Sequence, residues 1–511
     1  MGETYLYKRN VNKKNSYNVW FAFPECYSFS LSSLGYMRLY QELDETDGVF
    51  TERIYTDTLN TVLKPQDVDA VCFSFSFDLD FVNIFSILEK YGIPLKSKER
   101  DDCPLVFAGG AVITDNPEPY KEIFDFMIIG DGEGVNAEVT EICKNNKHKT
   151  KSEILKILST VDGVYVPRIH NLNNRVKKSC VKSLECIYTP VLSDKSFFKN
   201  TFIIEISRGC YNCCGFCVAS YLNLPVRFAA YDTIIEKIEF GLQYTDKIAL
   251  LGALVSSHPR FNDICSYIKN KIKSGEKFEM SVSSLRVDAV TPDITETLRM
   301  CGQKSITIAI EAASERLRKV INKNLTEGQL FQAIKTAKEN GITGVKIYSM
   351  LGLPTETQDD IEEFIRLSKD FKKEFKGFNI TFSFSTFVPK PHTPFQWCGR
   401  EGTKSLEKKI AYLRKELSKT GMKPKFSSVK WDYYQALLSR ADESVTDYLI
   451  EVYKQGGKLG AYRSAAKKTG IEIDKFALPI NLDCELPWDV IEMRPDKEML
   501  KEEYMRLLDI V

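Results

Sequence analysis

The chain has 511 residues, of which 43% are apolar, and its formal net charge is +1. This length and apolar content are enough for two or three domains whose cores need no disulfide bonds, which excludes a fibrous or disordered protein. The balanced charge gives no indication of a nucleic-acid partner.

Residues 1–17 contain no apolar signal-peptide core, and no run of about 18 apolar residues occurs in the sequence. We therefore expect a cytoplasmic chain that does not span a membrane. Several of the 14 cysteines lie within apolar runs, such as Cys72 between Val71 and Phe73. In a reducing compartment such cysteines are expected to remain free thiols.

Between residues 17 and 143, short apolar runs alternate with amphipathic segments. The runs lie at residues 18–23, 70–75, 104–108 and 126–129. This alternation predicts a doubly wound, Rossmann-like parallel sheet. Small or polar residues at the run ends, among them Ser74, Ser76, Gly109 and Gly110, would let a large planar ligand approach the backbone. The alternative is that these glycines only make tight turns.

Residues 144–200 are expected to form a linker between two domains. The segment opens with the basic and polar residues 144–152, which we interpret as a solvated face. His148 and His170 lie in the segment without a potential partner nearby, so we assign no role to them.

Four cysteines lie close together at residues 210–217, on the loop after a predicted strand at residues 202–206. Loops at that end of a strand carry the chemistry in α/β proteins. Cys210, Cys214 and Cys217 are spaced so that they can hold one face of an iron-sulfur cube and leave the fourth iron open. A structural zinc site would need a fourth ligand, usually from a second pair, and no second pair follows. Cys213 falls outside the spacing and is expected to be a bystander.

From residue 201 to about residue 400, strand and helix patterns alternate. The predicted strands lie at residues 202–206, 247–251, 278–282, 305–310, 344–348 and 379–384. Helical patterns at residues 233–242 and 327–337 would cover the outside of the sheet, as crossover helices do. We therefore predict a partial (β/α)6 barrel.

With Gly209 ahead of it and Phe216 before its last cysteine, the cysteine motif closely resembles that of the radical SAM enzymes. The resemblance implies the same barrel, with a 4Fe-4S cluster on the three cysteines. It also implies that S-adenosylmethionine binds the open iron. One electron, from a reductant such as a flavodoxin or ferredoxin, then cleaves S-adenosylmethionine to a 5′-deoxyadenosyl radical.

The same resemblance implies that residues at the strand ends bind S-adenosylmethionine. The matching positions are Gly252, Ser283, Arg286, Glu311, Ser314, Arg316, Lys346 and Val388, the last through its backbone. One departure is the turn at Gly252, which lacks the acid that members of the family carry there. Taken singly, Lys346 is equally consistent with a surface lysine, and Glu311 with an acid near a helix N-terminus.

The N-terminal pattern resembles the cobalamin-binding domain that precedes the barrel in many radical SAM enzymes. Ser74, Ser76, Gly109 and Gly110 match the loops that flank the corrin tail in that domain. Residues 24–35, which supply an axial histidine in some relatives, contain no histidine. A bound corrin would therefore lack a histidine ligand from this loop, and the implied reaction is a cobalamin-dependent methyl transfer.

Residues 401–511 are predicted to form a C-terminal helical domain, with clear patterns at residues 404–417 and 496–508. A basic excess at residues 404–430 is equally consistent with a phosphate contact and with a solvated helix. Segments 389–397 and 486–488 resemble a widespread, poorly characterised radical SAM group that indicates no substrate.

Two other enzyme functions stay open. One is a cobalamin-independent radical SAM reaction. The other is methylthiotransferase-like modification of RNA or protein, which would need a second cluster on Cys26, Cys72 and Cys103. A non-catalytic metal-binding scaffold would leave the ordered strand-end residues without an explanation.

Overall fold

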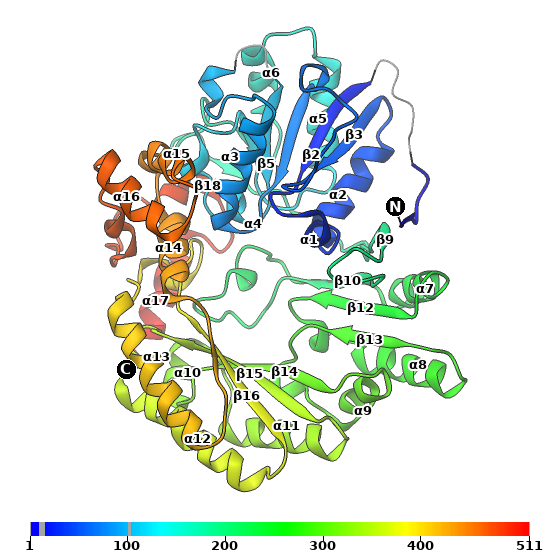
Figure 1. Cartoon of the computed structure of the whole chain (residues 1–511), viewed down its shortest axis with the longest axis vertical. Helices are drawn as coiled ribbons and strands as arrows, with labels where there is room; N and C mark the ends of the chain where they lie inside the picture. The colour runs from blue at the N-terminus through cyan, green and yellow to red at the C-terminus, as the bar shows by residue number, and fades with distance from the viewer. Residues whose placement is uncertain (1, 10–15, 101–103, 510–511) are drawn as a thin grey trace.

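The computed structural model describes residues 2–9, 16–100 and 104–509, and it is a mixed α/β protein with two parallel-sheet units (Figure 1). The N-terminal sheet has the strand order β3-β2-β4-β5-β6-β7. Its strands are β2 (Tyr17–Ala22), β3 (Val49–Ile54), β4 (Ala70–Ser74), β5 (Leu105–Gly109), β6 (Phe126–Ile128) and β7 (Val164–Tyr165). All neighbours are parallel except β6 and β7. The predicted doubly wound sheet is confirmed.

Helices cover both faces of this sheet. On one face, α2 (Leu34–Glu45), α5 (Val135–Asn145) and α6 (Lys151–Leu158) bury their apolar sides in one core with residues of the strands. On the other face, α3 (Phe81–Lys90) shares a second core with helices from the end of the chain. Two short helices, α1 (Tyr27–Ser30) and α4 (Ala111–Asp115), follow β2 and β5.

The structure differs from the sequence-based prediction at two places in this half. Strand β3 was not predicted, because Thr51, Glu52 and Arg53 give it a polar appearance. The segment 144–200 is not a bare linker: it contains α6, which begins with a capping box formed by Thr150 and Glu153, and the sheet strand β7. It also contains β8 (Val176–Lys177) and β9 (Val191–Ser193), and β9 pairs with β1 (Glu3–Tyr5).

All six strands predicted for the barrel are present. They are β10 (Phe202–Arg208), β12 (Lys247–Gly252), β13 (Glu279–Val282), β14 (Ser305–Glu311), β15 (Gly344–Leu351) and β16 (Asn379–Thr386). They form two four-stranded sheets, which are completed by β11 (Arg227–Phe228) and β17 (Lys425–Phe426). Leu285 joins the two sheets by donating its backbone N–H to the carbonyl oxygen of Thr307 (2.8 Å). The partial barrel is therefore confirmed as an open, curved wall.

The outer surface of this wall is covered by helices, and alternation along the strands decides which side chains face them. In β14, Ile306, Ile308 and Ile310 are buried in the core with the helices, whereas Glu311 is only half-buried. The covering helices are α7 (Tyr231–Leu242), α8 (Phe261–Lys273), α9 (Pro292–Met300), α10 (Glu315–Val320), α11 (Glu327–Glu339), α12 (Gln358–Glu374) and α13 (Thr403–Lys419).

The C-terminal helices do not form a core of their own. Helices α14 (Val429–Arg440), α15 (Thr446–Lys454) and α16 (Leu459–Thr469) pack on the N-terminal unit, beside α3 in Figure 1. The chain then forms β18 (Ile491–Glu492), which pairs with β8, and ends in α17 (Lys497–Leu508). In the residues described, no helix has the length and apolar character needed to cross a membrane.

Candidate functional site

The three cysteines of the predicted cluster motif line a single cavity of about 240 Å³. Cys210 and Cys214 are buried and Cys217 is half-buried. The side-chain amide of Asn212 lies 3.2 Å from Cys210 Sγ, and Cys214 Sγ lies 3.7 Å from the carbonyl oxygen of Asn322. In the described part of the chain, no group of three or more Cys, His, Asp or Glu residues surrounds a single metal-ion position.

The thiols are held in a desolvated environment and influence one another. The pKa of Cys214 is raised to about 12, chiefly by burial; Lys323 acts against this rise, and the neighbouring Cys217 and Cys210 add to it. Burial also raises the pKa of Cys217. The raised pKa values of Cys214 and Cys217 favour the protonated thiols near neutral pH, and a bound metal cation would favour the thiolates.

Cys213 lies apart from this cavity. Its backbone has a positive φ of 50°, and its side chain packs against an apolar cluster that contains Trp397 and Trp488. Its sulfur donates to the carbonyl oxygen of Tyr211 (3.5 Å). The structure thus separates Cys213 from the other three cysteines of the loop.

The opposite wall of the cavity carries charged side chains. A bulge at the end of β14 and a positive φ of 62° place Glu311 in the lining. Its carboxylate lies 3.2 Å from the Lys323 ammonium. Burial alone would lower the pKa of Lys323, but the Glu311 carboxylate raises it. The cavity therefore offers one carboxylate and one ammonium to a ligand that carries both charges.

Arg286 also lines the cavity, where its guanidinium makes two hydrogen bonds to the Asp288 carboxylate (2.9 and 2.7 Å). Gly252 and Ser283 lie beside it: Ser283 Oγ donates to the carbonyl oxygen of Gly252 (3.4 Å). A Cβ on Gly252 would lie 2.1 Å from Ser207 Oγ, so only glycine fits there.

Of the eight predicted S-adenosylmethionine residues, Arg286 and Glu311 line this cavity, whereas Gly252 and Ser283 only adjoin the lining residues Ala253 and Ser284, and the remaining four lie outside it. Ser314 caps α10 by accepting from the Leu317 backbone N–H (3.2 Å), and it also bonds to Asp360. Arg316 forms an ion pair with Asp360 as well. Lys346 lies over the ring of Tyr348 on the same strand, and Val388 is half-buried in the loop after β16.

Asn322 and Lys323 are among the polar lining residues that were not predicted. They follow α10 and reach the cysteine loop only through tertiary folding: the Asn322 side-chain amide donates to the carbonyl oxygen of Cys213 (2.9 Å). The available signal was the polar run after α10, in which Asn322 has the positive φ that asparagine tolerates.

A second cavity, of about 320 Å³, lies between the N-terminal sheet and the barrel. The N-terminal unit contributes all four of the predicted residues, Ser74, Ser76, Gly109 and Gly110, and the barrel contributes Glu205, Arg208 and Leu251. A Cβ on Gly110 would lie 2.6 Å from the carbonyl oxygen of Phe75. Close backbone packing therefore explains the glycine at 110 without a ligand.

An ion-pair network closes one side of this interdomain cavity. Arg208 pairs with Asp131 (2.9 Å), Glu133 (2.6 Å) and Glu205 (2.7 Å). Arg227 pairs with Asp131 as well. Burial alone would raise the pKa of Asp131, but Arg208 and Arg227 hold it below its usual value. The network ties the cysteine loop to the N-terminal sheet, because Arg208 is two residues ahead of Cys210.

Comparisons with known proteins agree with this geometry. Residues 204–368 match the model of the radical SAM superfamily, and residues 35–167 match that of the N-terminal domain of radical SAM proteins. An uncharacterised protein of Methanocaldococcus jannaschii is 31% identical over 75% of this chain and 80% of its own. The chain therefore belongs to the radical SAM superfamily. This membership makes it an enzyme and implies a 4Fe-4S cluster and S-adenosylmethionine.

More distant relatives and solved structures share parts of this organisation. An uncharacterised methyltransferase of Pyrococcus horikoshii is 23% identical over 60% of this chain and 67% of its own. The radical S-adenosylmethionine methyltransferase TsrM of Kitasatospora setae has a TM-score of 0.52 at 12% identity, over 75% of each chain. The cobalamin-dependent radical enzyme OxsB has a TM-score of 0.52 at 16% identity, over 79% of this chain and 56% of its own. At these identities the structures establish the shared fold.

Proposed function

We propose that this radical SAM enzyme binds cobalamin between its N-terminal sheet and its barrel and transfers a methyl group from S-adenosylmethionine to a substrate. One observation carries the proposal: Ser74, Ser76, Gly109 and Gly110 line the same cavity as Glu205, Arg208 and Leu251 of the barrel. α/β proteins bind their ligands at the carboxyl ends of the strands. Here those ends of the N-terminal sheet and of the barrel line a common space.

In this proposal Cys210, Cys214 and Cys217 hold the cluster, since all three line one cavity and their spacing leaves one iron open. The bound cluster would supply the reductive cleavage of S-adenosylmethionine to methionine and a 5′-deoxyadenosyl radical, with one electron from a reductant such as a flavodoxin or ferredoxin. The protein would hold the cluster ligands in place and keep water from them. Asn212 bonds to Cys210, and Phe216 packs against an apolar cluster beside the loop.

Glu311, Lys323 and Arg286 would bind the amino acid part of S-adenosylmethionine. Glu311 would accept hydrogen bonds from the ligand, and Lys323 or Arg286 would pair with its carboxylate. Gly252 and Ser283 would shape the adjoining wall. Ser314 and Arg316 are committed to Asp360, so we assign them to positioning the start of α10 against α12.

The residues of the interdomain cavity suit a corrin. Serine hydroxyls and glycine backbone approach it from the N-terminal sheet, and Leu34, Tyr36 and Leu39 add an apolar side. None of the four histidines of the chain lines this cavity. A bound cobalamin would therefore have no histidine ligand here, in agreement with the missing histidine at residues 24–35.

The methylthiotransferase-like alternative needs a second cluster. Cys72 lies within β4, where burial raises its pKa, and Cys26 Sγ bonds to Ser28 (3.3 Å). Cys103 is outside the described residues. Proteins named tRNA-2-methylthio-N(6)-dimethylallyladenosine synthase are related in sequence, but the example from Clostridium beijerinckii is 23% identical over 45% of this chain. No contact between Cys26 and Cys72 supports this alternative.

Product analysis tests the proposal without knowledge of the substrate. Radical cleavage releases 5′-deoxyadenosine and methionine, whereas methyl transfer from the sulfonium leaves S-adenosylhomocysteine. Reduced, reconstituted protein should release 5′-deoxyadenosine with or without cobalamin, and S-adenosylhomocysteine only with cobalamin. If S-adenosylhomocysteine does not form when cobalamin is present, the enzyme is a radical SAM enzyme of another kind.

A further inference from the structure

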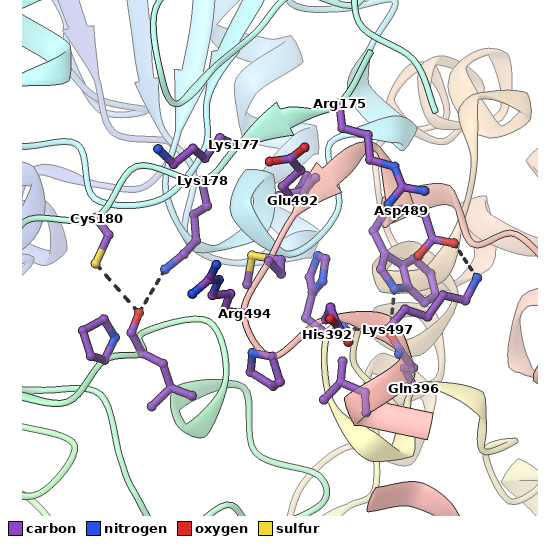
Figure 2. Close-up of a pocket in the computed structure, with 18 residues that line it drawn as sticks. Arg175, Lys177, Lys178, Cys180, His392, Gln396, Asp489, Glu492, Arg494 and Lys497 are labelled. Carbon is purple, nitrogen blue, oxygen red and sulfur yellow. Dashed lines mark hydrogen bonds and ion pairs between the residues drawn. The ribbon is translucent and has the colours of Figure 1, made fainter. Parts of the chain in front are cut away.

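A third cavity, of about 490 Å³, lies apart from the two already described. Three segments that are distant in the sequence enclose it: the linker around β8, the bend at Leu224 and Pro225, and the C-terminal segment from Trp488 to Leu500 (Figure 2). His392 and Gln396, from the loop after the last predicted barrel strand, form its inner wall. Its volume is in the range of small-molecule sites.

Cationic side chains dominate the lining, and three of them, Arg175, Lys178 and Arg494, have no acidic partner among the described residues. In the parts of the chain that the structure describes, Arg494 has no hydrogen bond or ion pair, and Arg175 bonds only to the carbonyl oxygen of Leu172 (3.2 Å). Lys178 is half-buried and donates to the carbonyl oxygen of Leu222 (2.6 Å). Figure 2 shows Lys178 and Arg494 on one side of His392 and Arg175 on the other side.

Two of the three carboxylates of the lining are engaged, one of them with a lysine of the same lining. Asp489 pairs with Lys497 (2.6 Å), and Asp496 accepts from the backbone N–H of Met499 (3.0 Å) at the start of α17. Glu492 is exposed on β18, and Lys177, the remaining cation, pairs with Asp162 (3.2 Å). The uncompensated charge of the cavity is therefore positive.

His392 provides an independent indication that a ligand completes this cavity. The residue is only 5% exposed, and its Nε2 atom is buried without a hydrogen-bond partner. Next to it, Gln396 is fixed by accepting from the Trp488 indole (2.7 Å) and from the His392 backbone N–H (2.9 Å). A buried ring nitrogen without a partner is costly unless a ligand or water reaches it.

We propose that this cavity binds a phosphate-bearing ligand of about nucleotide size, with Lys178 and Arg494 on the phosphate and His392 on another polar group of the ligand. One guanidinium group can bind two phosphate oxygens at once, which suits the unpaired Arg494 on the same side of the cavity as the Lys178 ammonium. The volume exceeds what a phosphate ion alone would fill.

The position of the cavity connects it to both other sites. The segment 218–225 is a wall of all three: Ala219 and Ser220 line the cysteine cavity, Asn223 lines the interdomain cavity, and Leu224 and Pro225 line this one. A ligand here would contact the segment that directly follows Cys217. The proposal does not depend on whether the enzyme uses cobalamin.

Equilibrium dialysis of the cluster-reconstituted full chain would test the site, with S-adenosylmethionine present to fill the cysteine cavity. The probes are inorganic phosphate and uridine monophosphate. Lys178→Gln/Arg494→Gln should bind the preferred probe at least tenfold more weakly than the wild type. Arg506→Gln, at an exposed position paired with Glu503, is the control and should leave binding unchanged.

The two probes distinguish the possible sources of the phosphate. Equal affinities would indicate a site for free phosphate, and tighter binding of the nucleotide would indicate a nucleotide site. Failure of both probes to bind saturably at millimolar concentration would overturn the proposal, as would binding that the double variant leaves unchanged.

Cysteine alkylation would locate the bound probe. Cys180 is exposed and lines the cavity, whereas Cys484 is exposed outside it. A bound probe should slow the alkylation of Cys180 several-fold and leave that of Cys484 unchanged, as mass spectrometry would report. Equal rates for Cys180 with and without a saturating probe would show that the ligand binds elsewhere.

Discussion

Arg208 donates a hydrogen bond from Nη1 to the carboxylate of Asp131 (2.9 Å), and this bond joins the barrel to the N-terminal sheet. Arg208 is separated from the cluster motif only by Gly209, whose φ is +81°. A Cβ at Gly209 would lie 2.4 Å from the carbonyl oxygen of Asn223. The start of the cysteine loop is thus fixed both to the other sheet and to the wall shared by the three cavities.

Replacing Asp131 with Asn should destabilise the protein by about 3 to 5 kcal/mol near pH 7, because it leaves the buried Arg227 without its carboxylate. The thermal unfolding midpoint of the anaerobic protein measures the effect. Asp263→Asn removes a pair in which both side chains are about half exposed, and it should change stability by no more than about 0.5 kcal/mol. Equal midpoints for the two variants would show that the Arg208–Asp131–Arg227 network contributes little.

Replacing Cys210, Cys214 and Cys217 together with Ala should abolish the cluster. Wild-type protein reconstituted anaerobically should carry about four irons per chain, as a single cluster requires. Cys213→Ala is the matched control: because Cys213 packs away from the cavity, this variant should keep its iron and its EPR signal. About eight irons in the wild type would instead favour the two-cluster alternative.

Glu311→Ala should weaken the binding of S-adenosylmethionine by about 10- to 150-fold, which corresponds to the loss of a charged hydrogen bond of about 1.5 to 3 kcal/mol. Binding to the oxidised, reconstituted protein is the appropriate measurement, since no turnover occurs. Glu339→Ala, on the exposed end of α11, should bind normally. Wild-type affinity in Glu311→Ala would remove this carboxylate from the cosubstrate site.

His392 should make stability depend on pH. Its pKa is lowered from 6.5 to about 3, chiefly by burial; the backbone of Asp115 acts against this shift, and the positive charge of Lys178 adds to it. As pH falls, the unfolded chain takes up the proton before the folded chain does. The stability that depends on a neutral His392 is therefore fully present above pH 6.5 and is lost as pH falls from 6.5 toward 3.

The loss attributable to His392 between pH 7.5 and pH 5.5 should be about 1.4 kcal/mol. Chemical unfolding of His392→Gln should show a pH dependence that is shallower by this amount. His148→Gln, at an exposed position, should behave like the wild type. If His392→Gln and the wild type lose stability in parallel, the imidazole already has a proton-accepting partner when the chain is folded.

Local pattern predicted most of the elements but few of their contacts. The apolar runs located every barrel strand because those strands are buried against helices, as Ile306, Ile308 and Ile310 are. Strand β3 was not predicted because its central residues are polar. Residues 401–511 were predicted to be helical from the patterns at residues 404–417 and 496–508, yet such a pattern does not identify the surface that helices will cover, which for α14 to α16 is the N-terminal unit.

The candidate site was predictable to the extent that its residues are close in sequence. The spacing of Cys210, Cys214 and Cys217 predicted a shared cavity, and the strand ends predicted Glu311 and Arg286 in its lining. Lys323 enters the same cavity from the loop after α10, and Asp131 reaches Arg208 across 77 positions. Contacts of this kind arise from tertiary folding and leave no periodic signal.

Corrin binding by the interdomain cavity is the most direct test of the central claim. Protein reconstituted with hydroxocobalamin and then desalted should retain about one corrin per chain, measured from its visible spectrum and its protein content. Ser76→Trp would fill the cavity from an exposed position on its wall, without the clash that any side chain at Gly110 would have with Phe75. This variant should lose the corrin and keep its iron, whereas Ser152→Trp, on the exposed surface of α6, should keep both. Wild-type protein that elutes without corrin, or Ser76→Trp that retains it, would contradict the account.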